Sequence, residues 1–254
     1  MNCLDGRIAL ITGASRGIGE EVAFQFAQSG AHVIAAARSA NDLDKLKTRI
    51  QSIGGEIDIE ALDVSDPTAV RGLAERVADK CGRLDILVGN AAVHGPETPL
   101  HKILLEDWQQ MFATNLEANW HLIRYFDGLL KASDAGRAIF VTSRASVLKL
   151  PKVGAYSASK AALDAMVRSY ATELLGTKVR ANLLDPGPVR TQMRAEAVPG
   201  EDASALPAPE VVAPLFVEMA KSTYMENGKT VRFLEIGLRK RLRQLASDIK
   251  HGRL

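Results

Sequence analysis

The stretch that decides the fold runs from Arg7 to Ala27 and reads RIALITGASRGIGEEVAFQFA. Its first part, from Ile8 to Ile11, is a short apolar run of the kind that forms a buried strand. Three glycines follow at once, and the remainder carries apolar side chains at helical spacing. We therefore expect a strand, a glycine turn and a helix in direct succession.

The three glycines have a spacing that suits a turn around a dinucleotide. Gly13 can take a tight backbone turn, Gly17 lets the backbone approach a pyrophosphate, and Gly19 allows the helix to pack closely on the strand. The start of the helix then offers unpaired N–H groups to phosphates. A dinucleotide-binding motif requires this context, although a glycine turn without a ligand has the same form. The turn residues expected to contact a cofactor are Gly13, Ser15, Arg16, Gly17, Ile18 and Gly19.

The rest of the chain continues to alternate strands with helices. Such alternation predicts an α/β fold: a Rossmann-like, doubly wound parallel sheet of about seven strands with helices on both faces, in a single domain over residues 1–254. Further strands are expected at 31–36, 56–62, 84–89, 138–142, 178–184 and 230–234. Further helices are expected near 41–53, 67–81, 106–132, 155–175 and 210–220.

Composition narrows the classes of partner. The net charge of +2 gives no electrostatic reason to expect nucleic acid. No apolar run is long enough to span a membrane. The two cysteines, Cys3 and Cys81, lack metal or redox spacing and fit a reducing cytoplasm. We expect a soluble cytoplasmic protein without a metal site, in which residues 238–254 form a basic, solvated tail.

Tyr156 and Lys160 supply the parts for acid–base chemistry at a carbonyl oxygen. They lie four residues apart in the run YSASK, so a helix over 155–175 would place them on one face. An ammonium beside a phenol lowers the phenol's pKa towards the range useful for proton transfer. Ser143 ends the apolar run RAIFVTS, so its hydroxyl should emerge at the edge of the sheet where ligands bind. A Tyr-x-x-x-Lys pair also arises by chance on helices.

The glycine pattern TGxxxGxG at residues 12–19, taken with Ser143, Tyr156 and Lys160, resembles the compact members of the short-chain dehydrogenase/reductase family. The resemblance extends from about residue 5 to about residue 192 and implies an NAD(P)-dependent oxidoreductase. It implies that Tyr156 exchanges a proton with the substrate oxygen and that Lys160 lowers the tyrosine pKa and binds the nicotinamide ribose. Ser143 would hydrogen-bond the substrate oxygen, and Asn115 would take part in a proton relay.

Further positions acquire roles through the same resemblance. Asp63 and Val64 match the pair that holds the adenine edge. Asn90 and Ala91 match the core of an N-N-A-G motif, in which Gly89 and Ala92 are departures expected to alter strand support more than chemistry. The nicotinamide end would meet a turn that contains Pro186, Gly187, Val189 and Thr191. Residues 192–209 lie where members of the family carry a substrate lid. Helices 106–132 and 155–175 correspond to those that form the interface of a homodimer or homotetramer in the family.

The second strand indicates which nicotinamide cofactor is used. Folds that select NAD usually place an acid at its end, to bond the ribose 2′-hydroxyl. This chain has Ala37 and Arg38 there, and Arg38 can bind a 2′-phosphate together with Arg16. We expect NADP(H), with NAD as the alternative.

The substrate stays open within the carbonyl and alcohol compounds, which include ketones, aldehydes and 3-oxoacyl-like thioesters. Relatives commonly end in a strand followed by V-D-G-G, whereas residues 231–237 read VRFLEIG, which argues against a routine fatty-acid reductase. Two alternatives remain: an NAD-linked alcohol or sugar dehydrogenase, and a cofactor-binding sensor or scaffold with little turnover.

Overall fold

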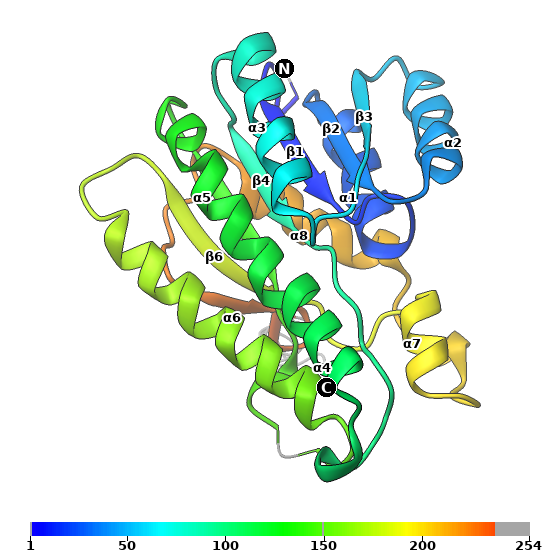
Figure 1. Ribbon diagram of the computed structural model, residues 1–254. Coiled ribbons are helices and arrows are strands. Elements are labelled where there is room, and N and C mark those ends of the chain that lie inside the picture. Colours follow the sequence, from blue (N-terminus) through cyan, green and yellow to red (C-terminus); the bar gives the residue numbers. More distant parts are fainter. Residues whose placement is uncertain (1, 149, 237–254) are drawn as a thin grey trace, which may run out of the picture.

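Seven parallel strands form one sheet in the order β3-β2-β1-β4-β5-β6-β7 (Figure 1). The computed structural model describes residues 2–148 and 150–236, so the basic tail expected at 238–254 lies outside the described residues. The register pairs Ala9 of the first strand in the chain with Val33 on one side and Ile86 on the other. The strands are β1 (Ile8–Thr12), β2 (His32–Ala37), β3 (Ile57–Ala61), β4 (Ile86–Gly89), β5 (Arg137–Val141), β6 (Arg180–Asp185) and β7 (Thr230–Arg232).

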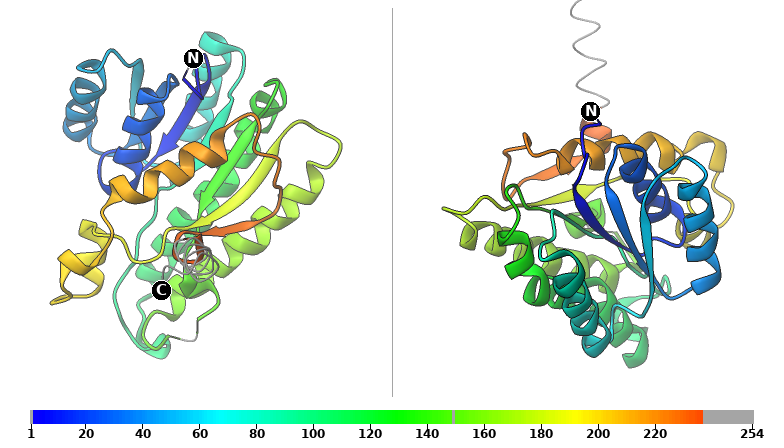
Figure 2. Two further views of the ribbon diagram at one scale, coloured as in Figure 1. Left: turned by 180° about the vertical axis from the view of Figure 1, so that it is seen from behind. Right: turned by 90° about the horizontal axis from the view of Figure 1, so that it is seen from above.

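Helices cover both faces of this sheet, as the view from above shows (Figure 2). One apolar core lies under α1, α2 and α8, and a second lies under α3, α5 and α6. The expected doubly wound α/β fold is confirmed. The helices are α1 (Gly17–Gln28), α2 (Ala40–Gln51), α3 (Pro67–Cys81), α4 (Leu105–Phe112), α5 (Ala118–Lys131), α6 (Gly154–Glu173), α7 (Gln192–Ala197) and α8 (Pro209–Ala220), with short 3₁₀ turns at Leu100–Lys102, Arg144–Ser146 and Ala203–Ala205.

Two expected elements end or break differently. The helix expected over 106–132 is interrupted by a π-helical segment, η2 (Ala113–Glu117), between α4 and α5. The strand expected over 230–234 ends at Arg232, and the next residues turn helical. Arg232 pairs with Glu235 at 3.3 Å, and a separation of three residues suits a helical turn.

The two helices expected to face a partner subunit carry ten large apolar side chains of interest, which divide between the chain's own core and its surface. Half of them are buried beneath α5 and α6, namely Leu122, Phe126, Leu163, Val167 and Tyr170. Another four, Leu116, Ile123, Tyr125 and Met166, are partly buried against the same core. Trp120 alone of this set is exposed, at 45%.

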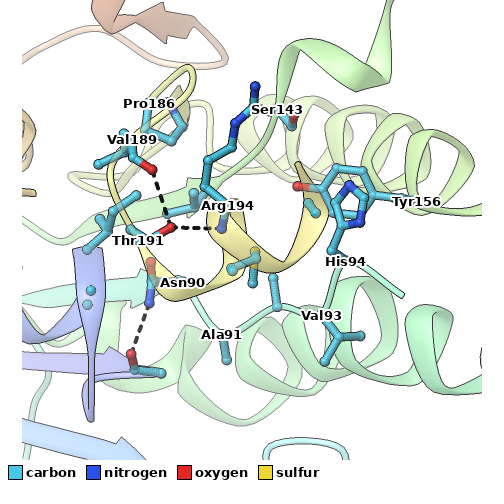
Figure 3. Close-up of a pocket in the computed structure, with 18 of the residues that line it drawn as sticks. Asn90, Ala91, Val93, His94, Ser143, Tyr156, Pro186, Val189, Thr191 and Arg194 are labelled. Atoms are coloured by element: carbon cyan, nitrogen blue, oxygen red, sulfur yellow. Dashed lines mark hydrogen bonds between the residues drawn. The ribbon is translucent and has the colours of Figure 1, made fainter. Parts of the chain in front are cut away.

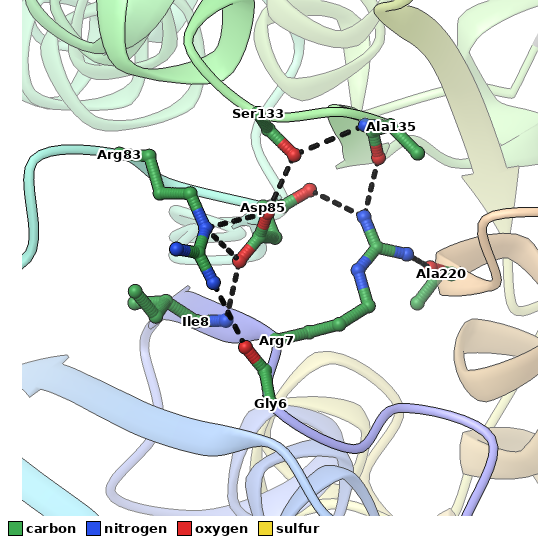
Figure 4. A network of polar contacts seen from close by, with 8 residues as sticks. All are labelled: Gly6, Arg7, Ile8, Arg83, Asp85, Ser133, Ala135 and Ala220. Carbon is green, nitrogen blue, oxygen red and sulfur yellow. Dashed lines mark hydrogen bonds and ion pairs between the residues drawn. The ribbon is translucent and has the colours of Figure 1, made fainter.

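A polar network braces the amino-terminal edge of the sheet (Figure 4). The buried carboxylate of Asp85 accepts hydrogen bonds from the N–H of Ile8 at 2.9 Å and the hydroxyl of Ser133 at 2.5 Å. Arg7 donates to the carbonyl oxygens of Asp85, Ala135 and Ala220.

The carboxyl end of α8 is held at the same edge. Arg137, the first residue of β5, donates to the carbonyls of Lys221 at 3.1 Å and Ser222 at 2.6 Å. Cations are favourable at the negative end of a helix dipole. Because these groups lie at the amino-terminal edge, the carboxyl ends of the strands are left for a ligand.

Candidate active site

A cavity of about 950 Å³ opens at the carboxyl ends of the strands (Figure 3). The loops that follow β1, β2, β3, β4, β5 and β6 all contribute to its wall. Every residue that the sequence nominated lines this cavity except Asn115. Those that line it are Gly13, Ser15, Arg16, Gly17, Ile18, Gly19, Arg38, Asp63, Val64, Asn90, Ala91, Ser143, Tyr156, Lys160, Pro186, Gly187, Val189 and Thr191.

The glycine turn leaves no room for side chains at two of its positions. Gly13 has φ of +65°, and a Cβ there would lie 2.9 Å from the Cα of Ala91. A Cβ on Gly19 would lie 2.2 Å from the carbonyl oxygen of Gly13. Arg16, at the amino-terminal cap of α1, makes no side-chain capping hydrogen bond, so the first N–H groups of the helix face the cavity without that partner.

Asn90 supports the glycine turn from the neighbouring strand. Its amide nitrogen donates to the carbonyls of Thr12 at 2.9 Å and Gly13 at 3.3 Å. The hydroxyl of Thr12 in turn accepts from the backbone N–H groups of Asn90 at 3.0 Å and Ala91 at 3.1 Å. The turn and the end of β4 are therefore one hydrogen-bonded unit.

The departure at Gly89 has a structural reason that the sequence did not reveal. A Cβ on Gly89 would lie 2.2 Å from Oδ1 of Asn119 and 2.7 Å from the ring of Phe140. Asn119 is buried on α5, and its amide nitrogen donates to the carbonyl of Asn115 at 2.9 Å. An amide from α5 thus fills the space where a side chain on β4 would stand.

Asn115 lies outside the cavity wall but holds it in place. It sits in the π-helical segment η2 and is fully buried. Its Oδ1 accepts from the N–H of Val93, and its Nδ2 donates to the carbonyl of Val93, both at 2.9 Å. The same Nδ2 donates to Oγ of Ser159 on α6 at 3.0 Å. Its expected part in a proton relay stays a prediction.

Ser143, Tyr156 and Lys160 come together in the cavity. Ser143 follows β5, and its hydroxyl accepts from the N–H of Ala145 at 3.2 Å and shares a hydrogen bond with Tyr156. Tyr156 lies in the first turn of α6 and Lys160 one turn later. The buried Lys160 ammonium donates to the carbonyl of Val141 at 2.9 Å and lies 5.9 Å from the centre of the Tyr156 ring.

Burial shifts the pKa values of both Tyr156 and Lys160. Burial raises the pKa of Tyr156, the hydrogen bond to Ser143 opposes this, and the carboxylate of Asp185 adds to it. Burial also lowers the pKa of Lys160 to about 8, against the attraction of Asp164. Lys160 is not among the causes of the Tyr156 shift, so its expected lowering of the tyrosine pKa stays a prediction.

His94 and Asp185 are cavity residues to which the sequence gave no role. The ring centre of His94 lies 4.7 Å from that of Tyr156, with the planes tilted by 37°. Asp185 ends β6, is buried, and accepts from the N–H of Gly187 at 3.0 Å. The position of Asp185 directly before the Pro-Gly turn was the only local sign that it lines the cavity. His94, a single histidine in a loop, gave no such sign.

The wall after β2 contains Arg38 and the carboxylate of Asp42. Ala37 is buried at the end of the strand, and Arg38 lines the cavity beside it. Ser39 caps α2 by accepting from the N–H of Asp42 at 3.3 Å. The Asp42 carboxylate accepts from Ser39 at 2.8 Å and pairs with Lys45 at 2.7 Å.

The segment 192–209 is tied to the glycine turn and braced within itself. Arg16 donates to Oε1 of Gln192, the first residue of α7, at 2.8 Å. Arg194 binds both carboxylate oxygens of Glu201, each at 2.6 Å. Thr191 caps α7 by accepting from the N–H of Arg194.

Two kinds of feature are absent from the described residues, 2–148 and 150–236. No group of three or more His, Cys, Asp and Glu side chains there is placed to hold a metal ion. Within the same residues, no helix combines the length and apolarity needed to cross a bilayer.

Comparison with known proteins places the chain among oxidoreductases. Residues 7–202 match the family model described as short chain dehydrogenase. The 3-oxoacyl-(acyl-carrier-protein) reductase of Thermotoga maritima is 33% identical over 190 residues, which are 75% of this chain and 77% of that protein.

Solved structures agree with this placement. A short-chain dehydrogenase structure from Pseudomonas syringae superposes with a TM-score of 0.88 at 36% identity, over 91% of this chain and 96% of that one. A short-chain dehydrogenase from Escherichia coli CFT073, complexed with NADPH, gives a TM-score of 0.86 at 33% identity, over 91% and 98% of the two chains.

Lys160 should make stability depend on pH in a defined direction. Its pKa is about 8 when folded, against 10.5 for the free side chain, so the unfolded state binds the extra proton between these values. Stability therefore rises with pH through this window, and the burial penalty acts fully below pH 8. The free energy of unfolding of Lys160→Met minus that of the parent should therefore be larger at pH 7 than at pH 10, by about 2–3 kcal/mol.

Urea unfolding of both chains at the two pH values measures this difference. Lys178→Met, which removes a lysine that is 70% exposed, is the control and should show no such change. If the stability difference between the parent and Lys160→Met is the same at both pH values, the burial penalty assigned to Lys160 is wrong.

Proposed function

The chain belongs to the short-chain dehydrogenase/reductase family of NAD(P)-dependent oxidoreductases, and we propose that it transfers hydride between NADP(H) and a carbonyl or alcohol substrate with Tyr156, Lys160 and Ser143 as its catalytic groups. The single observation that carries the proposal is that these three side chains share one cavity with the glycine turn. The turn fits a pyrophosphate because Gly13 and Gly19 have no room for a Cβ and the start of α1 lacks a side-chain cap.

NADP(H) is favoured over NAD(H) by the charges after β2. Arg38 and Arg16 both line the cavity, beside the amino-terminal end of α2, and together they suit a 2′-phosphate. The nearby carboxylate of Asp42 is engaged by Ser39 and Lys45, which limits it as a partner for a free 2′-hydroxyl. The Escherichia coli CFT073 structure is a complex with NADPH, which supports the same choice.

The catalytic groups would divide the proton chemistry between them. Bound NADPH supplies the hydride that reaches the carbonyl carbon. Tyr156, whose pKa is raised by burial, stays protonated at neutral pH and donates its proton to the carbonyl oxygen. Ser143 hydrogen-bonds the same oxygen where negative charge develops. Lys160 would hold the nicotinamide ribose and, through its positive charge, favour the phenolate after transfer.

The proposal also covers a substrate lid, the location of the protein and its assembly. Residues 192–209 act as a substrate lid, which the tie between Arg16 and Gln192 supports. The protein is cytoplasmic, in keeping with the free thiols of Cys3 and Cys81. The chain forms a homodimer or homotetramer through α5 and α6, supported by the exposed Trp120.

Arg38→Asp should reverse cofactor preference. The change removes one charge-assisted contact to the 2′-phosphate and adds a carboxylate for a free 2′-hydroxyl. Loss of such a contact corresponds to roughly ten- to a hundred-fold weaker NADPH binding. Fluorescence titration with NADPH and NADH measures both affinities, and Arg71→Asp, which changes an exposed arginine of α3 outside the cavity lining, is the control. Unchanged NADPH affinity in Arg38→Asp would contradict the cofactor assignment.

Tyr156→Phe should lower kcat by about 10²–10⁴-fold because it removes the proton donor and little else. NADPH affinity should stay close to that of the parent, since Lys160 and the ring remain. A carbonyl and alcohol panel followed at 340 nm identifies a substrate and measures the rates. A variant that kept more than about a tenth of the parent rate would remove Tyr156 from the mechanism, and a parent inactive on the whole panel would favour the sensor.

Trp120→Glu should shift the protein towards a monomer if α5 forms the interface. The substitution places a charge in a surface that two subunits would bury. Light scattering at micromolar concentration measures the mass of the parent and the variant, and a monomeric parent would end the assembly proposal.

A further inference from the structure

The last described residues carry side chains that the proposed reaction does not use. Residues 231–236 read VRFLEI, whereas relatives commonly carry V-D-G-G after the corresponding strand. β7 ends at Arg232, and the chain turns helical directly after it. Because β7 runs parallel to β6, this helical turn lies at the same edge of the sheet as the Pro-Gly turn, which is formed by Pro186 and Gly187.

Asp185 and Arg232 are direct neighbours across β6 and β7. The register pairs the two residues, and Nε of Arg232 lies 4.0 Å from Oδ2 of Asp185. Asp185 is buried, whereas the Arg232 side chain is 31% exposed. Burial raises the pKa of Asp185, and the N–H of Gly187 and the Arg232 guanidinium are the two largest effects that oppose the rise. The guanidinium therefore helps to keep a buried carboxylate ionised at the wall of the cavity.

Asp185 in turn restrains the Pro-Gly turn that follows it. Its Oδ1 accepts a hydrogen bond from the N–H of Gly187 at 3.0 Å, and both residues line the cavity. The carboxylate also acts on the proton donor, because the pKa of Tyr156 is raised first by burial and further by the charge of Asp185. One carboxylate thus connects Arg232, the Pro-Gly turn and the phenol.

Leu234 adds an apolar contact to the same turn. A Cβ on Gly187 would lie 3.2 Å from both Cδ1 and Cγ of Leu234, so the leucine packs directly against the glycine backbone. Glu235, in the same helical turn, pairs with Arg232 at 3.3 Å. The helical turn after β7 therefore contacts the Pro-Gly turn through both a charged and an apolar side chain.

β7 has other contacts that fix its place in the sheet. The Asn182 side chain accepts from the N–H of Lys229 at 2.9 Å and donates to the carbonyl of Glu226 at 2.6 Å. The Asn227 side chain accepts from the N–H of Ala181 at 2.9 Å. Because these hydrogen bonds hold the start of the strand, substitutions at its end should act on the Pro-Gly turn and leave the fold intact.

We propose that Arg232 and Leu234 are positioning residues, which hold the Pro-Gly turn in the conformation that receives the nicotinamide end of the cofactor. Arg232 acts through the carboxylate of Asp185, and Leu234 acts through the backbone of Gly187. This inference rests on the proposed function, because it takes the bound group to be the nicotinamide of NADP(H). The adenosine half of the cofactor, which Arg38 would bind, does not depend on these contacts.

The binding of two ligands separates this local role from a general loss of structure. NADPH carries the nicotinamide, whereas 2′,5′-ADP carries only the adenosine half with its 2′-phosphate. In calorimetric titrations, Arg232→Gln should weaken NADPH binding about three- to tenfold and leave 2′,5′-ADP binding within about twofold of the parent. Leu234→Ala should show the same selectivity, and Arg232→Lys should keep most of the NADPH affinity because it retains the charge. Equal losses for both ligands, or no loss for NADPH, would overturn the proposed role.

A double substitution tests whether Arg232 acts through Asp185. Arg232→Gln should weaken NADPH binding in the parent but hardly change it in Asp185→Asn, since the charge on which the guanidinium acts is then gone. Losses that add up in the double variant would contradict this route. Arg76→Gln removes another ion pair between two elements, with Glu60 at 2.6 Å and outside the cavity lining, and should leave both affinities unchanged.

Hydrogen exchange in the cofactor-free protein tests the restraint without any ligand. The amides of residues 187–191 should exchange about three- to tenfold faster in Arg232→Gln and Leu234→Ala than in the parent or in Arg76→Gln, because contacts that restrain the turn are lost. Unchanged exchange would overturn the inference whatever the ligand binding shows. If exchange rises as expected but the parent binds neither NADPH nor 2′,5′-ADP, the restraint stands and the proposed function fails.

Discussion

The buried amide of Asn115 is the interaction on which the site most depends. It holds both backbone groups of Val93 and the hydroxyl of Ser159, so it joins the loop after β4 to the helix that carries Tyr156 and Lys160. The π-helical segment η2 places Asn115 between them, and such segments occur often at functional sites. His94 follows Val93 directly, so the same amide fixes the imidazole beside the tyrosine ring.

Most of the fold and most of the residues that line the cavity could be predicted from the spacing of nearby residues in the sequence. The glycine turn was predictable because backbone geometry at Gly13 and Gly19 excludes side chains, and glycine spacing records that exclusion directly. Tyr156 and Lys160 were predictable because four residues make one helical turn. Relations between distant segments were not predictable. The residues around Gly89 in the sequence do not indicate that the Asn119 side chain packs against it. Those around Asn90 do not indicate the contact between His94 and Tyr156.

The pKa shifts in the site could not be predicted from the sequence either. The sign of the Tyr156 pKa shift depends on how deeply α6 buries the phenol and on the carboxylate of Asp185, and neither is visible in the run YSASK. Lys160 and Asp164 are buried on the same helix, and Asp164 is compensated by the hydroxyls of Thr142 at 2.5 Å and Ser146 at 3.0 Å. Lys160 has the carbonyl of Val141 instead. A site of this kind gives up stability to keep an ionisable group poised for proton transfer.

The contacts of Arg7 join segments more than two hundred residues apart, which bears on how the chain folds during synthesis. Arg7 directly precedes β1, yet the carbonyl partners of its guanidinium belong to Asp85, Ala135 and Ala220. On the ribosome, the strand that opens the domain emerges first, while the last of these partners is made more than two hundred residues later. Until then the amino-terminal half holds a cation whose native acceptors are incomplete. The nucleotide-binding half is therefore expected to close late, together with α8, as one cooperative unit and not as an early, independent subdomain.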